Sequence, residues 1–541
     1  MKNLKRETNG ITLVALVITI IILLILAGIV IAALTGENGL ITRAQEARTK
    51  TEEAQRKEEE QLAELEALAT GKDVPIIQVD DKNPGQLEQE DTNTMVINSI
   101  EDLVFFSYDV ANGNRYENKT VKLGTNLDFN SDKSYVDPNR TNFGIYGYDG
   151  PLKQLLTTSI GFDPIGENVG ENNFYGTFDG DNKAICSLYI NMKSDAIARA
   201  GLFSTSYGVI QNLGLVDVNI SAESIIGGVV ATSYNNIYNC YVTGNINATG
   251  SSWMPVGGIC GTFFGNVIEN SYNLASIECK NIKPENGNAN ITLGGIVGQI
   301  EGEEVTINKC FNKGNLTADG GNNEIEIGGI CGNYTSTVDT MIIKNSYNNA
   351  KIVGKTLNGT YNISGITTLL PQQGKVINCY NSGEIVAEGN TESNFFRVGG
   401  IVAYQDLNSE VANVFNIGGI KVNIQTSNGN LVVGGIAGNT NWSDTVKMNY
   451  AYNTGKIELE SAISQNIGSI SGNLKLATLN NCYYLKGTYD VAIGNDDSIK
   501  GIQELDSIDE FPSVLEVVNG EGVFKEDTNN INNGYPILQW Q

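Results

Sequence analysis

Histidine is absent from all 541 residues of the sequence. This absence excludes the Ser-His-Asp and Cys-His nucleophilic systems, together with the HExxH zinc motif. No two cysteines have the CxxC spacing that would support a zinc site. No Asp-x-Asp-x-Asp run has the spacing of a calcium loop, and Asp179-Gly180-Asp181-Asn182 is a fragment that we interpret as a turn. We therefore predict no metal and no cofactor.

Positive charge is scarce, because 35 Lys and Arg residues stand against 61 Asp and Glu residues, for a net charge of -26. Such a field repels phosphate backbones, so we expect no nucleic-acid partner. Carboxylate chemistry is left open, since polysaccharide-cleaving solenoids can use Asp or Glu pairs. The candidates Glu301, Glu303 and Glu304, or Asp496 and Asp497, lie in turn-like runs. A solvated loop is the favoured interpretation of both runs, and we predict that the protein is not an enzyme.

One long apolar run exists, from Ile11 to Leu34, and it contains no charge. As a helix it would span about 36 Å, enough for the hydrocarbon core of a bilayer. Lys2, Lys5 and Arg6 precede it, so we expect a cytoplasmic amino terminus and export of everything that follows. The sequence thus predicts a single-pass membrane anchor with an extracellular ectodomain. A buried core helix is the alternative.

A repeated sequence motif fills most of the remaining chain. It reads Gly-Gly-Ile-x-Gly, then about ten polar residues, then Asn-(Cys/Ser)-(Tyr/Phe)-Asn-x-Gly, and neighbouring copies lie about 30 to 39 residues apart. A period in this range indicates a stacked array. The Gly pairs begin at Gly227, Gly257, Gly294, Gly328, Gly399 and Gly434, with weaker copies at Ser364 and Gly468, and the aromatic positions are Tyr241, Tyr272, Phe311, Tyr347, Tyr380, Phe415, Tyr452 and Tyr483.

Each copy contains three short runs with strand periodicity, such as Leu293 to Val297, Thr306 to Phe311 and Asn315 to Ala318. We predict a mainly β fold: a parallel β-solenoid (right-handed β-helix) of about eight coils, preceded by a long amino-terminal transmembrane and stalk α-helix. Antiparallel blades are less favoured because two-residue hairpin turns are scarce.

The predicted organisation has seven parts: a leader (1–10), a transmembrane helix (11–34), a stalk helix (35–70), a linker (71–94), an amino-terminal cap (95–170), the solenoid (171–500) and a carboxy-terminal cap (501–541). The amino-terminal cap should contain a helix over 97–110. In the carboxy-terminal cap we expect Phe511, Val514, Leu515 and Trp540 to cover the last coil, because solenoid ends need capping.

Equivalent residues of stacked coils should lie about 4.8 Å apart and form ladders of like side chains. We expect one asparagine ladder whose amides bond up and down the stack at a bend; a ligand groove is the alternative. Its members would be Asn239, Asn270, Asn345, Asn378, Asn413 and Asn481.

The eight cysteines follow the repeat. Cys240, Cys310, Cys379 and Cys482 share one repeat position with Ser271 and Ser346, and Cys260 and Cys331 share another with Val or Ala. Residues that exchange in this way behave as small core fillers. We predict free, buried thiols.

The repeat words resemble the GLUG-repeat family of bacterial surface proteins over about residues 95–541. The matching words are Ala200-Gly201-Leu202-Phe203, Asn212-Leu213-Gly214-Leu215 and Gly295-Ile296-Val297-Gly298. The resemblance implies a surface location and leaves the activity open, since such arrays occur in adhesins and beside protease domains.

The amino terminus resembles a type IV prepilin leader in Lys5-Arg6-Glu7-Thr8-Asn9-Gly10, followed by Ile11-Thr12-Leu13-Val14. The resemblance implies that a prepilin peptidase cuts between Gly10 and Ile11 and that Ile11 is then methylated. The family has Glu at the fifth mature position, where this sequence has Ala15, so assembly into a filament is in doubt.

These features together predict a membrane-anchored, extracellular repeat protein that acts as an adhesin-like or structural display rod. Its ligand would be a glycan or a surface protein, bound by the variable turns at Lys280 to Asn290 and Gly389 to Phe396. The alternatives are a glycan-active β-helix enzyme and a minor pilin or pseudopilin of a filament or secretion system.

Overall fold

The computed structural model describes residues 87–129, 161–167, 170–192, 198–282, 290–357, 359–390, 395–425, 430–441, 445–460, 465–474, 478–495, 501–511 and 524–541. The predicted leader, transmembrane helix and stalk helix lie outside these ranges, as do the processing residues Gly10 and Ile11. Among the helices within these ranges, none is long and apolar enough to cross a membrane.

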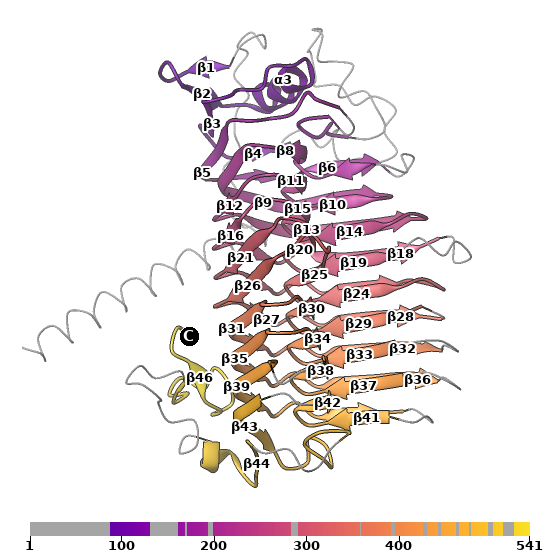
Figure 1. Ribbon diagram of the computed structural model, residues 1–541. Helices are drawn as coiled ribbons and strands as arrows, with labels where there is room; N and C mark the ends of the chain where they lie inside the picture. The colour runs from indigo at the N-terminus through magenta and orange to yellow at the C-terminus, as the bar shows by residue number, and fades with distance from the viewer. Residues whose placement is uncertain are drawn as a thin grey trace, which may run out of the picture. The chain divides into compact units, whose positions relative to one another are not determined.

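The described chain winds into a β-solenoid of about eight turns, built from three parallel sheets that run along its length (Figure 1). Sheet 1 contains β7 (Arg199–Ala200), β10 (Ile225–Gly227), β14 (Met254–Gly257), β19 (Ile291–Gly294), β24 (Ile325–Gly328), β29 (Tyr361–Ser364), β33 (Phe395–Gly399), β37 (Asn430–Gly434) and β41 (Gln465–Gly468). Sheet 2 contains β8 (Phe203–Ser206), β11 (Val230–Ser233), β15 (Cys260–Phe263), β20 (Val297–Ile300), β25 (Cys331–Tyr334), β30 (Thr367–Leu370), β34 (Val402–Gln405), β38 (Ala437–Thr440) and β42 (Ser471–Asn473).

Sheet 3 closes each coil and has 26 strands in the described ranges. They are β1 (Glu88–Gln89), β2 (Thr94–Ile97), β3 (Thr120–Leu123), β4 (Leu127–Asp128), β5 (Thr177–Cys186), β6 (Tyr189–Met192), β9 (Val209–Ala222), β12 (Ile237–Tyr238), β13 (Tyr241–Gly250), β16 (Val267–Glu269), β17 (Tyr272–Asn273), β18 (Ser276–Asn281), β21 (Glu304–Asn308), β22 (Phe311–Asn312), β23 (Leu316–Asp319), β26 (Thr340–Lys344), β27 (Tyr347–Asn348), β28 (Ile352–Thr356), β31 (Lys375–Asn381), β32 (Ile385–Asn390), β35 (Glu410–Asn416), β36 (Ile420–Gln425), β39 (Lys447–Asn453), β40 (Ile457–Leu459), β43 (Thr478–Leu485) and β44 (Ile502–Leu505). The parallel stack is confirmed: the antiparallel pairs among named strands of the described chain are β1 with β2, and β45 (Phe524–Lys525) with β46 (Ile537–Leu538).

Two of the predicted strands in the 291–319 coil are wrong. The run Leu293 to Val297 is divided between β19 and β20, because the chain turns a corner at the glycine pair. A Cβ on Gly295 would lie 2.2 Å from the Gly329 carbonyl oxygen of the next coil, so only glycine fits there. The run Thr306 to Phe311 is divided between β21 and β22, where Lys309 has a positive φ of 53°.

A fully buried asparagine ladder, different from the predicted one, runs through the corner after the aromatic position. It consists of Asn273, Asn312, Asn348, Asn381, Asn416 and Asn453, each with no exposed surface. Asn381 is typical: its Nδ2 donates to the Gly383 carbonyl at 3.0 Å and to Oδ1 of Asn416 at 2.8 Å, while its own Oδ1 accepts from Nδ2 of Asn348 at 2.8 Å. Each amide thus satisfies a buried carbonyl of its own coil and links to the next coil.

The predicted asparagine ladder lies three residues earlier and has another role. Its members have φ near +50°, the left-handed region that Asn tolerates. Bonding along the stack is confirmed, since Nδ2 of Asn378 donates to Oδ1 of Asn345 at 3.1 Å and Nδ2 of Asn413 to Oδ1 of Asn378 at 2.9 Å. These side chains are half-buried or exposed, so this ladder shapes a bend and the buried ladder satisfies the interior.

The buried ladder explains why the two halves of the repeat occur together. A Cβ on Gly295 would lie 2.4 Å from Cγ of Asn312, and a Cβ on Gly400 would lie 2.6 Å from Cγ of Asn416. The second glycine of each pair therefore makes room for the asparagine of its own coil. In the coil where Val242 stands in place of Asn, Gly228 faces the Val242 methyl groups instead.

The predicted aromatic ladder is confirmed for its first seven rings. Neighbouring rings from Tyr241 to Tyr452 are stacked, with centroids 4.5 to 5.2 Å apart. The free, buried state of all eight cysteines is also confirmed. Cys310 Sγ lies 3.4 Å from the carbonyl of Asn308, and Ser346 Oγ donates to the equivalent carbonyl of Lys344 at 2.7 Å. Cys and Ser exchange at this position because both reach the same backbone acceptor.

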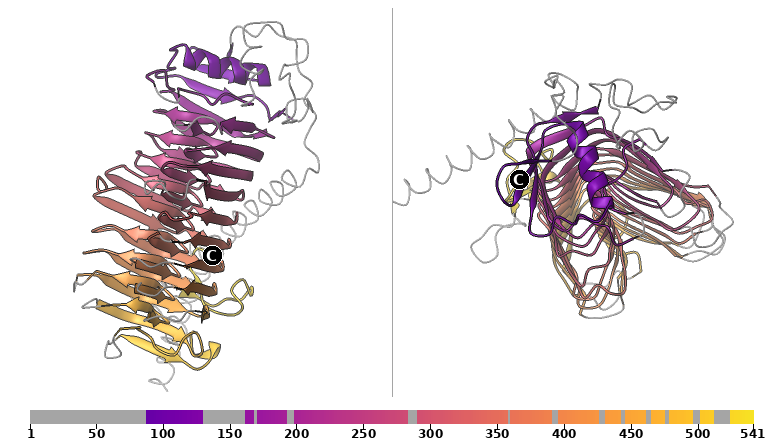
Figure 2. Two further views of the ribbon diagram at one scale, coloured as in Figure 1. Left: turned by 90° about the vertical axis from the view of Figure 1, so that its right-hand side faces the viewer. Right: turned by 90° about the horizontal axis from the view of Figure 1, so that it is seen from above.

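The amino-terminal end of the core is closed by α3 (Ile100–Ala111), close to the helix predicted over 97–110. Ser99 caps it by accepting from the Asp102 N–H at 3.1 Å. Phe106 is fully buried and packs on Phe174 and Phe178 of the first coils. Figure 2 shows the helix lying across this end of the stack.

The carboxy-terminal segment does not simply cover the last coil. β44 extends sheet 3 by pairing with β43, and the 3-10 helix η2 (Ile508–Glu510) follows. The chain then turns back along the side of the stack, where Trp540 reaches Tyr347 and Tyr380 in earlier coils (Figure 1). Val514 and Leu515 lie outside the described residues.

Replacing Asn381 by Ala should lower the free energy of unfolding by about 2–4 kcal/mol, because three buried hydrogen-bonding groups lose a partner. Chemical denaturation of the full chain, followed by circular dichroism, measures this change. Asn413→Gly is the matched control: glycine accepts the φ of 55° at this position, so the loss should stay below about 1 kcal/mol. Equal losses in the two variants would contradict the assigned roles.

Candidate functional site

A second row of stacked rings follows sheet 2 on the amino-terminal flank of the solenoid. Tyr207, Tyr234 and Phe264 directly follow β8, β11 and β15, and Tyr175 precedes β5. The ring centroids are 4.7 Å apart for Tyr175 and Tyr207, 4.3 Å for Tyr207 and Tyr234, and 4.5 Å for Tyr234 and Phe264. We call these four residues the flank row.

The flank row presents ring edges and phenol hydroxyls to solvent, because the ring faces are stacked on one another. Tyr234 is 39% exposed. The Arg115 guanidinium carbon lies 5.0 Å from the Tyr175 ring centroid, at the amino-terminal end of the row. Burial, and then the neighbouring Tyr234, raise the pKa of Tyr207, while Arg199 and Arg115 act to lower it. Two guanidinium groups therefore act on the row in a chain whose net charge is -26.

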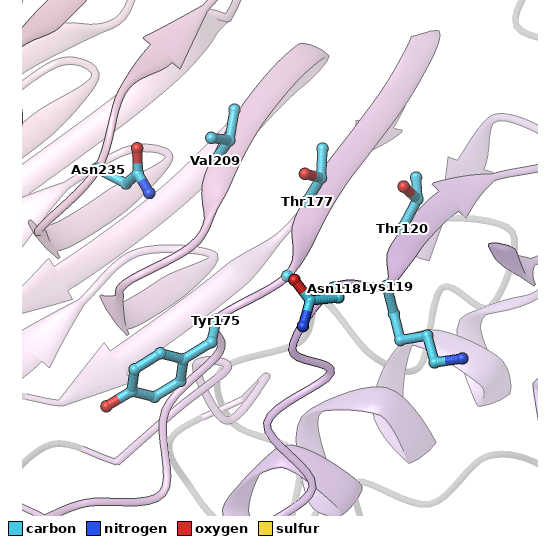
Figure 3. A pocket seen from close by; sticks show the side chains of 8 residues that line it. Asn118, Lys119, Thr120, Tyr175, Thr177, Val209 and Asn235 are labelled. Carbon is cyan, nitrogen blue, oxygen red and sulfur yellow. The ribbon is translucent and has the colours of Figure 1, made fainter. Parts of the chain in front are cut away.

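A shallow depression of about 350 Å³ adjoins the flank row. Its lining is polar: Asn118, Lys119, Thr120, Tyr175, Gly176, Thr177, Val209 and Asn235. Figure 3 shows Tyr175 and Lys119 on either side of Asn118. The ammonium group of Lys119 donates to the Thr92 carbonyl at 2.6 Å and to Oδ1 of Asn93 at 3.3 Å, both neutral acceptors. The depression thus offers a cation, amides and hydroxyls beside stacked phenols.

The predicted carboxylate run lies at the other end of the flank row. Glu301 follows Phe264 in the stack, since its N–H donates to the Phe263 carbonyl at 2.8 Å. Its carboxylate accepts from Nε2 of Gln299 at 3.1 Å, and burial raises its pKa. Glu303 is exposed and Glu304 is the exposed first residue of β21. The Glu301 carboxylate is thus paired with a neutral amide, while Glu303 and Glu304 face solvent.

The other predicted positions lie only partly within the described residues. Asp179-Gly180-Asp181-Asn182, predicted as a turn, lies within strand β5, where the pairing with β9 shifts register between Asp179 and Lys183. The irregularity is local: Oδ1 of Asp179 accepts from the Asp181 N–H at 2.8 Å, and Asp181 and Asn182 have φ of 49° and 58°. Asp496 and Asp497 lie outside the described residues. So do residues 283–289 and 391–394, which form most of the two turns predicted to bind a ligand.

A buried polar seam joins the outward-facing sides of sheets 1 and 2, and sequence reasoning missed it. Glu326 in β24 is 5% exposed and accepts hydrogen bonds from Asn333 in β25 and, at 3.1 Å, from Asn362 in β29. In β33, the strand that follows β29 in sheet 1, the Arg397 guanidinium carbon lies 4.9 Å from the Tyr404 ring centroid. Burial, with the Glu324 carboxylate adding to it, raises the pKa of Glu326 to about 8.

The seam had a signal in the sequence. The row in register with Glu326 in sheet 1 carries Pro255 and Thr292 on one side and Asn362, Arg397 and Val432 on the other. Two residues of opposite charge, Glu326 and Arg397, thus stand in a row of otherwise uncharged residues. Since Glu326 is nearly inaccessible to solvent, its hydrogen bonds tie the two sheets together, and the flank row with its depression is the better candidate for contact with a ligand.

No known protein family matches the chain. Over 103 residues the chain is 35% identical to halomucin of Haloquadratum walsbyi, a match that covers 19% of this chain and 1% of halomucin. A crystal structure from Bacteroides ovatus, described as a candidate immunoglobulin A1 protease, aligns over 85% of this chain and 95% of its own with 16% identity and a TM-score of 0.36.

A second solved structure, named IgA1 Protease, aligns over 59% of this chain and 21% of its own, with 20% identity and a TM-score of 0.34. Both TM-scores are below 0.5, so neither likeness bears on activity. The chain thus spans about a hundredth of the length of halomucin.

The raised pKa of Glu326 makes stability depend on pH. A carboxyl group whose pKa is raised in the folded state stabilises the fold at pH values below the unfolded pKa, near 4.5, and this contribution is lost as pH rises through about 8. Glu326→Gln removes the ionisation, but its amide nitrogen would face one of the two amide donors, Asn333 or Asn362, so the variant should be less stable than the wild type at pH 5. Between pH 5 and pH 8.5 the difference in stability should shift in favour of the variant by an amount on the order of 2 kcal/mol. Denaturation midpoints across this range test it, and Glu303→Gln, at an exposed position, should show no such trend.

Proposed function

We propose that this protein is a non-enzymatic surface rod, held at a bacterial membrane by its amino-terminal segment and displaying the solenoid outside the cell. The observation that carries the proposal is the flank row beside the polar depression. It offers a ligand phenols, amides and cations at a fixed spacing on a stiff scaffold. Adhesion, through an extracellular glycan or surface protein, is the use that such a surface supports best.

The motifs that resemble GLUG repeats also support the proposal of a surface protein. Ala200-Gly201-Leu202-Phe203 spans the corner from β7 to β8, and Gly295-Ile296-Val297-Gly298 spans the corner from β19 to β20. The words that resemble GLUG repeats of bacterial surface proteins are thus the tight corners of the stack. This agreement favours a surface-protein origin for the array.

The charges around the flank row indicate which class of ligand it would bind. Arg115, Arg199 and Lys119 surround the flank row and its depression, whereas the chain as a whole is strongly acidic. This surface would therefore bind an anionic glycan better than the rest of the acidic rod would. Its acidic groups would approach the cations while its hydroxyls bond to Asn118, Asn235 and the phenols.

Binding of the full chain to immobilised polygalacturonate, with dextran as the neutral comparison, tests this assignment. We expect binding to the acidic polymer alone, weakening as salt is raised, and a loss of about tenfold in Lys119→Gln. Lys447→Gln, which removes an exposed lysine in β39 far along the stack, is the control and should bind like the wild type. Equal binding to dextran, or unchanged binding in Lys119→Gln, would contradict the proposed surface.

The resemblance of the leader to type IV prepilins makes processing part of the proposal. We expect cleavage between Gly10 and Ile11, so that protein extracted from membranes begins with methylated Ile11. Amino-terminal sequencing and mass spectrometry measure this. Gly10→Val should abolish the cut, whereas Asn9→Ala should leave it. An intact Met1 in membrane-extracted wild type would instead identify a plain anchor, and recovery of processed protein from sheared filaments would favour a minor pilin.

A further inference from the structure

The carboxy-terminal half of the aromatic ladder is covered by the tail of the same chain. Trp540 lies with its ring centroid 6.0 Å from those of both Tyr347 and Tyr380, and its Nε1 donates to the Asn378 carbonyl at 3.2 Å. Phe524 packs against Phe415 and Tyr452, at centroid distances of 6.4 and 5.6 Å. Both ladder rings lose all exposure as a result.

The tail also satisfies the ladder's polar atoms. The Tyr452 hydroxyl donates to the Pro536 carbonyl and accepts from Nδ2 of Asn532 at 2.9 Å. A buried hydroxyl without such partners would cost about 1–3 kcal/mol. The tail thus seals the ring edges and supplies their hydrogen bonds together.

The amino-terminal half of the ladder has no comparable cover in the described part of the chain. The ring contacts of the tail extend no further along the ladder than Tyr347. Tyr241, Tyr272 and Phe311 remain half-buried. The hydroxyl oxygen of Tyr272 is buried without a hydrogen-bond partner.

The sequence contains a second segment similar to the one that seals the other half. In the tail, Pro536 is followed by Ile537-Leu538-Gln539-Trp540, of which Ile537 and Leu538 are buried. Near the amino terminus, Pro75 is followed by Ile76-Ile77-Gln78-Val79. Both read proline, isoleucine, a branched aliphatic residue, glutamine and a large apolar residue. The segment Ile76–Val79 lies outside the described residues.

The connection is long enough. Val79 precedes Leu87, where the described chain begins, by eight residues, which can span about 26 Å. From Leu87, which directly precedes β1, strand pairing runs through β2, β3, β5 and β9 to β13, which begins with Tyr241. Five strand spacings amount to about 24 Å, so an extended connection lets Val79 reach Tyr241, with Ile76 about 10 Å further along the ladder. The direction also agrees, since the tail runs from Tyr452 toward Tyr347, and a segment leading to Leu87 would likewise run toward the amino-terminal coils.

We propose that Ile76–Val79 docks on the uncovered half of the aromatic ladder, at Tyr241, Tyr272 and Phe311, as Ile537–Trp540 docks on the other half. The two ends of the chain then seal one continuous strip of ring edges. This inference needs no ligand, membrane or processing step, and it stands or falls separately from the proposed function. A tail from a second copy, or a segment of another protein, is the competing occupant.

Hydroxyl-radical footprinting of the full chain, read by mass spectrometry, tests the proposal. In the wild type, oxidation of Tyr272 and Phe311 should be as low as that of Phe415 and several-fold below that of exposed Tyr234. Ile77→Asp should raise oxidation at Tyr272 and Phe311 at least threefold and leave Phe415 unchanged. Val79→Trp, which completes the match to the tail, should lower it further.

Two matched variants control for general unfolding. Leu538→Asp should raise oxidation at Phe415 and leave Phe311 unchanged, and Ile531→Asp, at a 55% exposed position of the tail, should change neither. Oxidation of Tyr272 and Phe311 at the level of Tyr234 in the wild type, or no change in Ile77→Asp, would overturn the proposal. Protection that disappears on dilution would also overturn it, because it would identify a second molecule as the occupant.

Discussion

In-register parallel pairing is the constraint on which the rest of this structure depends. Because each coil places its residues one strand spacing from those of the next, a residue type that suits one coil suits all of them. The buried asparagines show this most clearly. Nδ2 of Asn348 donates to Oδ1 of Asn381, and this orientation leaves Nδ2 of Asn381 pointing to the next coil, where it donates to Oδ1 of Asn416. Every amide in the row has to point the same way along the stack. Changes in chain length are therefore confined to the loops between strands.

The period of the repeat was sufficient to predict the solenoid, its parallel pairing, the aromatic ladder and the unpaired cysteines, since each follows from coils stacked in register. The corners were not predictable in the same way. Leu293-Gly294-Gly295-Ile296-Val297 alternates as a strand would, and the turn within it is imposed by the carbonyl of Gly329 in another coil and by the Asn312 side chain. A local pattern of apolar residues carries no information about contacts of that kind.

The two asparagine rows were indistinguishable for the same reason. Asn270 and Asn273 belong to one repeat word, and either could bond along the stack. Asn270 adopts the left-handed backbone that ends a strand, while Asn273 turns into the interior against Gly258. The flank row was predictable in principle, because Tyr234 and Phe264 both stand seven residues after the first glycine of their repeats. The flank row stops where Glu301 replaces the ring, so the pattern of aromatic residues extends over only a few repeats.

The two rows of rings illustrate a general consequence of stacking aromatic residues on the outside of a solenoid. Stacking consumes the ring faces, so what remains is a strip of apolar edges that water solvates poorly and that a partner can cover. The flank row has phenol groups at Tyr175, Tyr207 and Tyr234, and the Arg115 guanidinium lies over the Tyr175 ring. Along the longer aromatic ladder, the strip at Phe415 and Tyr452 is closed by the chain's own tail. The segment that closes it also supplies hydrogen-bond partners for the enclosed hydroxyl, as Pro536 and Asn532 do for Tyr452.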